Sequence, residues 1–261
     1  MSQAELLWHR GVVVMLLVVL LLPLAATLVY AFSSTWGATI LPQGFELKWF
    51  LDLWRAPRFL TALGHSLLIC LGALLLSALL VLPVIFVIAY FFPWLDGVMN
   101  IFILLPFAVP PIVSSVGLLQ LYSDGPLALT GTPWILIGCY FTLMLPFMYR
   151  AVNNNMQAIN LRSLMDAAHL LGASTAQAAL LVILPNLRKG CMIAMLLSFS
   201  FLIGEFVFAN LLVGNRYETL QVYLYNMRNG SGHLTSALVI SYFVVVLLLT
   251  LLANAVGKEK E

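Results

Sequence analysis

The stretch SLMDAAHLLGASTAQAALLVILP, residues 163–185, is amphipathic and broken by turn residues, whereas the rest of the chain is almost uniformly apolar. We call it the elbow segment. Ser163, followed three residues later by Asp166, forms a capping-box pattern that predicts the start of a helix. Gly172 is suited to end that helix, because glycine readily adopts the left-handed conformation found just past helix ends.

A second start signal follows directly. Ser174 with Gln177 repeats the capping-box spacing, and Pro185 then interrupts the second helix or fixes its geometry, because proline lacks a backbone N–H. The pattern predicts two short helices joined by a sharp turn. Such a surface inside an apolar chain indicates a segment that a partner holds.

The composition indicates an integral membrane protein. Hydrophobic residues make up 62% of the 261 positions and charged residues only 8%, against about 25% charged residues in soluble domains. The net charge of +2 is too small to indicate binding to nucleic acid. The apolar stretch after Arg10 is too long for a signal peptide, so we interpret it as an uncleaved first span.

Six segments are long and apolar enough to cross a bilayer as helices. The chain is therefore predicted to be all-α and polytopic, with about six transmembrane helices in a single domain over residues 1–261. The expected spans are about 11–32, 63–91, 98–122, 133–156, 187–212 and 234–256. In the first loop, charges mixed with aromatic residues from Glu46 to Leu63 favour a short helix at the membrane interface.

The distribution of basic residues near the span ends predicts the orientation. With the N-terminus inside, both termini and the loop at about 157–186 are cytoplasmic. The basic residues then expected inside are Arg10, Arg150, Arg162, Arg188, Lys189, Lys258 and Lys260, and those expected outside are Lys48, Arg55, Arg58, Arg216 and Arg228.

The sequence shows no catalytic, metal-binding or cofactor-binding pattern. It has no glycine-rich phosphate loop, no H-E-x-x-H and no nucleophile elbow. The cysteines Cys70, Cys139 and Cys191 lie far apart in apolar runs and are expected to be small core residues. Any ATP chemistry would therefore have to come from a partner.

Glu205 is the only acidic residue inside a predicted span. A charge there is costly, so it should face a water-filled cavity or a polar partner. One interpretation is a carboxylate on a solute pathway, with Asn210 sharing the site. Two others stay open, namely a shorter fifth span that leaves Glu205 at the outer interface, and a structural bond to a neighbouring helix.

The third span contains Pro106, Pro110 and Pro111, followed by Ser114 and Ser115. A proline has no N–H, so it leaves a backbone carbonyl of the helix without its hydrogen bond. Within a membrane such a carbonyl is tolerated only beside protein or water. Broken helices often contribute to transport sites. Pro110, Ser114 and Ser115 are therefore candidate pathway residues, with an ordinary kinked helix as the alternative.

The elbow segment resembles the EAA loop of bacterial ABC importer permeases. That pattern reads E-A-A, three residues, G, nine residues, I-x-L-P, and here it appears as Asp166-Ala167-Ala168, Gly172 and Val182-Ile183-Leu184-Pro185. Asp166 replaces Glu and Val182 replaces Ile, while the spacing is intact. Four stretches of the chain also resemble the second permease of spermidine/putrescine-type importers and its iron, sulfate and 2-aminoethylphosphonate relatives. They are AFSSTWGATILPQGFELKWFLDLW, LGHSLLIC, LPFMYRAVNNNMQAINLRSLMDAAHLLGA and NLLVGNRYETLQVYLYNMRNG.

The resemblance implies the type I importer permease fold in a bacterial inner membrane. It implies that the helix after Ser163 docks in a groove of a cytoplasmic ATPase, with Asp166 reaching a basic residue and Ala167 and Ala168 permitting close approach. Gly172, Leu184 and Pro185 would complete this coupling site. Further implied partners are a second permease, two ATP-binding cassette subunits that bind the ATP, an extracytoplasmic solute-binding protein and membrane lipid.

The resemblance favours a polyamine as the transported solute, and Glu205 suits a cation. The alternatives are 2-aminoethylphosphonate, ferric iron or another small solute. A different class, a membrane-embedded enzyme or scaffold whose loop lies on the bilayer, is the remote alternative, and it would require the spacing match to be chance.

Overall fold

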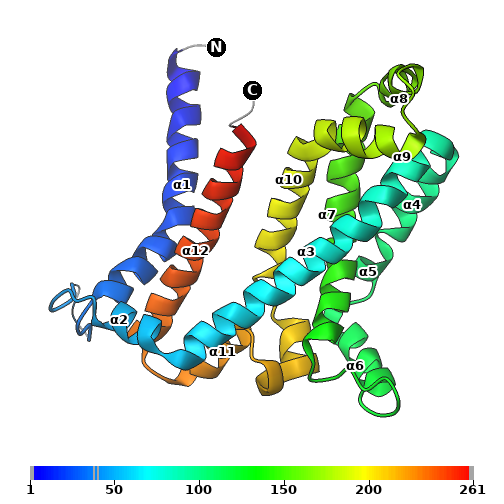
Figure 1. The fold of residues 1–261 in the computed structure, drawn as a ribbon. Helices are drawn as coiled ribbons and strands as arrows, with labels where there is room; N and C mark the ends of the chain where they lie inside the picture. The colour runs from blue at the N-terminus through cyan, green and yellow to red at the C-terminus, as the bar shows by residue number, and fades with distance from the viewer. Residues whose placement is uncertain (1–2, 38, 40, 259–261) are drawn as a thin grey trace. The chain divides into compact units, whose positions relative to one another are not determined.

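The computed structural model describes residues 3–37, 39 and 41–258, and Figure 1 shows that the chain is built from helices. Within that part, the only β-type pairing is an isolated bridge between Ser33 and Phe45. The prediction of an all-α protein is confirmed. The chain divides into two compact units, residues 1–60 with 224–248 and residues 61–223 with 249–261. Whether the chain is a single domain stays a prediction, and Lys260 lies outside the described residues.

The first unit combines the N-terminal part of the chain with residues 224–248. It contains α1 (Gln3–Phe32), α2 (Lys48–Arg55) and most of α12 (Gly232–Lys258). His233 lies in a stack between Tyr30 and Trp49, with ring centroids 4.2 and 5.3 Å away. The α2 helix confirms the short helix expected in the first loop, although α3 begins only two residues after it, at Pro57.

The second unit holds the remaining spans and the elbow segment. Its long helices are α3 (Pro57–Phe91), α7 (Pro133–Ala158) and α10 (Leu184–Leu202). Shorter helices are α4 (Asp96–Phe102), α5 (Leu105–Ala108), α6 (Pro111–Tyr122), α8 (Leu161–Leu170), α9 (Thr175–Ala178) and α11 (Leu220–Asn226). In Figure 1, α8 and α9 lie at one end of α7 and α6 lies towards the other.

Among the described residues, five helices are long and apolar enough to cross a membrane, and a bent pair raises the total to six. The pair is residues 93–108 with 111–122, which meet at 84°. The prediction of about six spans is confirmed. The fifth span is displaced from the predicted 187–212, because helix runs over Thr175–Leu202 and then ends. Hydropathy misplaced it because residues 203–213 are also largely apolar but form a turn and a separate helical segment.

The packing of α7 against α10 forms the core of the second unit. Tyr149, Met144 and Met148 on α7 are almost fully buried, as is Ala194 on α10. The two helices approach closely at Gly190, where a Cβ would lie only 2.6 Å from Cβ of Asn155. Both ends of the elbow segment are therefore attached to a tightly packed helix pair, since α8 follows α7 and α9 leads into α10.

Candidate functional site

The first helix of the elbow segment begins earlier than the sequence pattern predicted. α8 starts at Leu161, and its N-cap is Asn160, whose side chain accepts a hydrogen bond from the backbone N–H of Ser163 at 3.3 Å. The prediction that Ser163 caps this helix is wrong. Asn160 and Ser163 are both good capping residues three positions apart, and the chain is already helical at Ser163.

Gly172 ends this helix as predicted. Its φ of +85° is left-handed, a conformation that glycine adopts without steric cost. The N–H of Gly172 donates to the carbonyl of His169 at 2.9 Å, and the N–H of Ala173 donates to that of Ala168 at 3.0 Å. These two bonds form a Schellman motif, which fixes the bend between α8 and the next helix.

The second start signal is also confirmed. The N–H of Gln177 donates to Oγ of Ser174, and the N–H of Ser174 donates to Oε1 of Gln177 at 2.8 Å, which completes a capping box. A π-helical turn over Ala179–Ile183 follows and leads into α10 at Leu184. Helix continues through Pro185, so this proline shapes the joint without ending the helix.

The elbow segment buries one face and exposes the other. Met165 and Ala168 are buried within the chain, while Asp166 and Ala167 are exposed. Ala168 therefore packs inward, and it does not offer the close approach to a partner that we expected of it. Leu170 and Leu171 are 89% and 90% exposed. Leu184 and Pro185 are exposed at the far end of the elbow segment.

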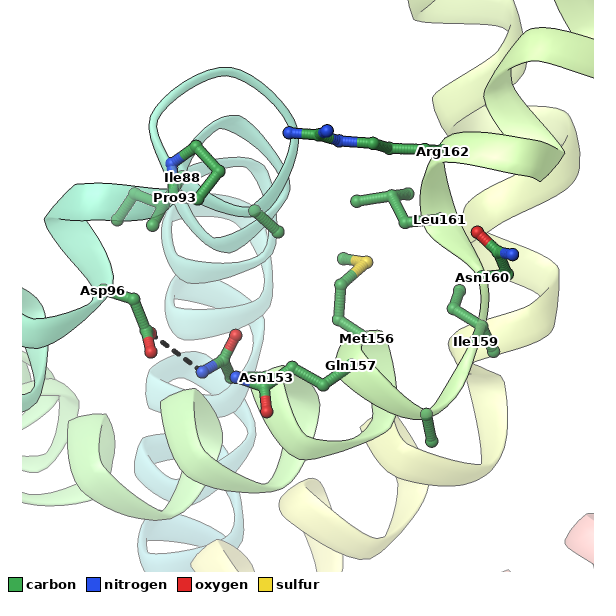
Figure 2. Close-up of a pocket in the computed structure, with 12 residues that line it drawn as sticks. Ile88, Pro93, Asp96, Asn153, Met156, Gln157, Ile159, Asn160, Leu161 and Arg162 are labelled. Atoms are coloured by element: carbon green, nitrogen blue, oxygen red, sulfur yellow. Dashed lines mark hydrogen bonds between the residues drawn. The ribbon is translucent and has the colours of Figure 1, made fainter.

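A pocket of about 520 Å³ lies beside the start of α8. Figure 2 shows Asp96 and Asn153 joined by a hydrogen bond at its edge, with Arg162 extending towards the turn that carries Pro93. Oδ1 of Asp96 accepts hydrogen bonds from Tyr149 Oη at 2.7 Å and Asn153 Nδ2 at 2.9 Å. These bonds attach the turn between α3 and α4 to α7, close to the point where α7 leads into α8.

The sequence alone assigned no role to Asp96, Tyr149 or Asn153. Asp96 lies in the short segment between the predicted spans 63–91 and 98–122, and its partners lie more than fifty positions further along the chain. An acidic residue at the edge of a span is a usable signal, because a half-buried carboxylate needs donors nearby.

Glu205 lies just past the end of α10 and not within a spanning helix. Its Oε1 accepts from the N–H of Phe208 at 2.8 Å, and its Oε2 accepts from the N–H of Ala209 at 3.2 Å and from Tyr140 Oη at 3.1 Å. The carboxylate therefore caps the helical segment that follows it and bonds to α7. The fifth span ends before Glu205, and the carboxylate makes a structural bond to a neighbouring helix, as two of the interpretations left open by the sequence expected. The position of Glu205 at the outer interface stays a prediction. Its role on a solute pathway stays a prediction.

The third span is broken where its prolines predicted. The chain bends between α5 and α6 at Val109–Pro110, and α6 begins at Pro111. Ser115 is fully buried, and its hydroxyl donates to the carbonyl of Pro111 at 2.8 Å. α6 packs against the π-helical segment Ala209–Val213. The structure thus brings the segment carrying Ser114 and Ser115 next to the one carrying Asn210.

An aromatic cluster lies beside the break. The ring of Phe147 on α7 lies 6.2 Å from that of Phe107 on α5 and 5.2 Å from that of Phe201 on α10, between ring centroids. Phe107 and Phe201 are more than two-fifths exposed. Large exposed aromatics so close together are typical of a surface that lipid or another protein covers.

Fold and site together define a multi-pass helical membrane protein with a rigid elbow exposed at one end of its spans. The chain belongs to the family described as binding-protein-dependent transport system inner membrane component, whose sequence profile matches residues 80–260. It is the permease subunit of an ABC importer. The family is one of transporter permeases and not of catalytic enzymes, so the remote alternative of a membrane enzyme is not supported.

Two relatives illustrate the range of the family. The chain is 29% identical over 248 residues to the putative 2-aminoethylphosphonate transport system permease protein PhnV of Salmonella typhimurium, covering 94% of this chain and 92% of PhnV. It is 25% identical over 219 residues to the spermidine/putrescine transport system permease protein PotC of Haemophilus influenzae, covering 83% of this chain and 84% of PotC.

Solved structures share the fold. A bacterial ABC transporter involved in the import of the acidic polysaccharide alginate superposes with a TM-score of 0.75 at 15% identity, over 100% of this chain and 99% of that one. The alginate transporter in complex with its alginate pentasaccharide-bound periplasmic protein gives a TM-score of 0.70 at 17% identity, over 97% and 94% of the two chains. The prediction of an importer permease fold is confirmed.

Proposed function

We propose that the elbow segment couples this permease to a cytoplasmic ATP-binding cassette subunit. The observation that carries this proposal is the exposure of Leu170 and Leu171 at the C-terminal end of α8, where a Schellman motif fixes the geometry. Burying each leucine in a groove would contribute about 1.5–3 kcal/mol. Asp166 is exposed on the same helix and would pair with a basic residue of the partner.

The assembly that follows contains this chain, a second permease, two ATP-binding subunits and an extracytoplasmic solute-binding protein in the inner membrane. The partner subunits bind ATP. The two termini and the elbow segment are cytoplasmic, as the basic residues indicate. A motion of the ATP-binding subunits would pass through the elbow segment into α7 and α10, because both are anchored to it and packed tightly on each other.

Copurification tests the coupling role. Leu170→Asp with Leu171→Asp should release the ATP-binding subunits while leaving the chain in the membrane, because two charges would enter an apolar groove. Trp94→Asp is a matched control, since Trp94 is also an exposed apolar residue, 71% exposed, and lies outside the elbow segment. Retention of the ATP-binding subunits by the double variant would overturn the proposal.

For the solute, we propose 2-aminoethylphosphonate. The support is the relative PhnV, which resembles this chain over more of its length than PotC does. A polyamine, favoured by the sequence reasoning, is the second candidate. The Glu205 carboxylate that suited a cation already accepts three hydrogen bonds from the chain itself, which weakens that argument.

Ligand binding by the cognate solute-binding protein separates the two candidates. Calorimetric titration with 2-aminoethylphosphonate should give saturable binding, and titration with putrescine should not. The reverse result would establish a polyamine importer.

A further inference from the structure

A second polar pocket, of about 520 Å³, lies in the second unit at the end of α7 opposite the elbow segment. α7 has 26 residues, and at 1.5 Å per residue it separates the two ends by about 40 Å. Three stretches supply the lining: Ser123 and Asp124 after α6, Thr130 and Gly131 before α7, and residues 210–216. By the orientation proposed above, this pocket opens on the extracytoplasmic side.

The side chain of Arg216 lies against the backbone of the neighbouring loop. Gly131 has a left-handed φ of +82°, and a Cβ added to it would lie 2.7 Å from Cδ and 3.2 Å from Nη1 of Arg216. The N–H of Gly131 donates to the carbonyl of Leu212 at 2.8 Å, which attaches this loop to the segment leading to Arg216. Glycine is therefore favoured at position 131 by its left-handed conformation, and its lack of a Cβ leaves the space that the arginine side chain occupies.

One candidate pathway residue belongs to this pocket. Asn210 lines it, and this residue lies on the helical segment whose first N–H groups are capped by Glu205. That segment packs against α6, which carries Ser114 and Ser115. The segment that carries Asn210 therefore both lines the pocket and packs against the helix that carries Ser114 and Ser115.

The lining offers one group of each charge together with neutral polar groups. The guanidinium of Arg216 presents a planar set of donors that matches the oxygens of a phosphonate and can bind them in pairs. The carboxylate of Asp124 is acceptor-only, so it suits an ammonium group. A polyamine carries positive charges alone and would be repelled by Arg216, whereas a small zwitterion satisfies both residues.

We propose that Arg216 and Asp124 form an entry subsite for a small zwitterionic solute, with Arg216 binding the oxyanion and Asp124 the ammonium group. This proposal rests on the transported solute proposed above. The subsite would receive the solute on its way from the binding protein towards the broken third span, and it would select against solutes that carry positive charge alone.

The test uses the complete transporter in proteoliposomes with its binding protein, and 2-aminoethylphosphonate and putrescine as probes. Arg216→Gln should raise the KM for 2-aminoethylphosphonate uptake by about tenfold or more, because a charge-assisted pair of hydrogen bonds is lost. Arg216→Lys should fall between this variant and the wild type, since lysine keeps the charge and loses the paired geometry. Asp124→Asn should also raise the KM for 2-aminoethylphosphonate, because the ammonium group loses its acceptor.

Arg228→Gln is the matched control. Arg228 is an arginine further along the same part of the chain, but its Cζ lies 3.8 Å from the centre of the Tyr225 ring, and it does not line the pocket. Its KM should equal that of the wild type. An unchanged KM in Arg216→Gln would overturn the subsite. A loss of 2-aminoethylphosphonate uptake in Arg216→Gln, together with weaker binding of the empty binding protein to the membrane complex, would show a protein-docking surface and would also overturn the subsite.

The wild-type transporter separates this proposal from the one on which it rests. Uptake of putrescine alone, or of neither probe, would overturn the proposed solute and the subsite with it. Uptake of 2-aminoethylphosphonate with an unaffected Arg216→Gln variant would overturn the subsite only.

Discussion

Replacing Gly172 tests whether the elbow segment works through its fixed bend. Its φ of +85° is left-handed, and no atom lies within 4 Å of the position that a Cβ would take. A substitution therefore meets no steric obstacle from neighbours, and its whole cost is in the backbone. Holding an L-residue in this conformation costs about 1–2 kcal/mol, more for a β-branched residue and less for asparagine.

This cost acts on the Schellman motif. If the backbone relaxes out of the left-handed region, the carbonyls of Ala168 and His169 lose the bonds donated by Ala173 and Gly172. A change of 1–2 kcal/mol shifts the equilibrium between bent and relaxed elbow by a factor of about 5–30. The exposed side chains of α8 would then meet the partner in a changed orientation.

The assay is solute-stimulated ATP hydrolysis by the reconstituted transporter. Stimulation should decrease in the order wild type, Gly172→Asn, Gly172→Ala, Gly172→Val. Gly138→Ala is the matched control, because Gly138 is also free of contacts within 4 Å but lies inside α7 with an ordinary φ; alanine there should be neutral or stabilising by up to about 1 kcal/mol. Wild-type stimulation in Gly172→Val would refute the reasoning, because the bend would then have no part in coupling.

Three further variants test the contacts that hold the site. Asp96→Ala should lower the melting temperature of the purified transporter, because its two donors on α7 lose a charged acceptor worth about 1.5–3 kcal/mol each; an unchanged melting temperature would contradict this. Glu205→Gln should reduce uptake without preventing assembly, since an amide accepts through one oxygen only, and normal uptake would count against its role. Gly190→Val should lower the free energy of unfolding of the protein, measured with denaturant, by at least about 1–3 kcal/mol. Adding Asn155→Gly to this variant should restore part of the lost stability, because the valine side chain clashes with Cβ of Asn155. If stability is not restored, the defect does not come from this contact.

The features that the sequence predicted well are local ones. Gly172 and the Ser174 capping box depend on residues within a few positions of each other, so their spacing alone defines them. The break at Pro110 is equally local, because proline removes a donor whatever surrounds it. The error at Ser163 is a choice between two adjacent caps, which sequence cannot decide when both residues accept hydrogen bonds well.

The features that the sequence missed depend on contacts between distant segments. The hydroxyl of Tyr149 reaches Asp96, and the backbone of Gly131 makes room for Arg216. Hydropathy also placed Glu205 within a helix, because an apolar run does not reveal where helical hydrogen bonding stops. No pattern within a window of ten or twenty residues contains this information.

The π-helical turn at Ala179–Ile183 has a consequence for any alignment of this region. Such a turn holds one residue more than an α-helical turn, and a residue corresponds to about 100° of rotation. Positions before Ala179 and after Ile183 therefore follow two different helical phases. A helical wheel drawn from Thr175 to Leu202 with a single phase would place Leu187, which is buried, on the wrong face. A relative that lacks this extra residue should be aligned with a gap here, and its elbow would be rotated by the same amount relative to its fifth span.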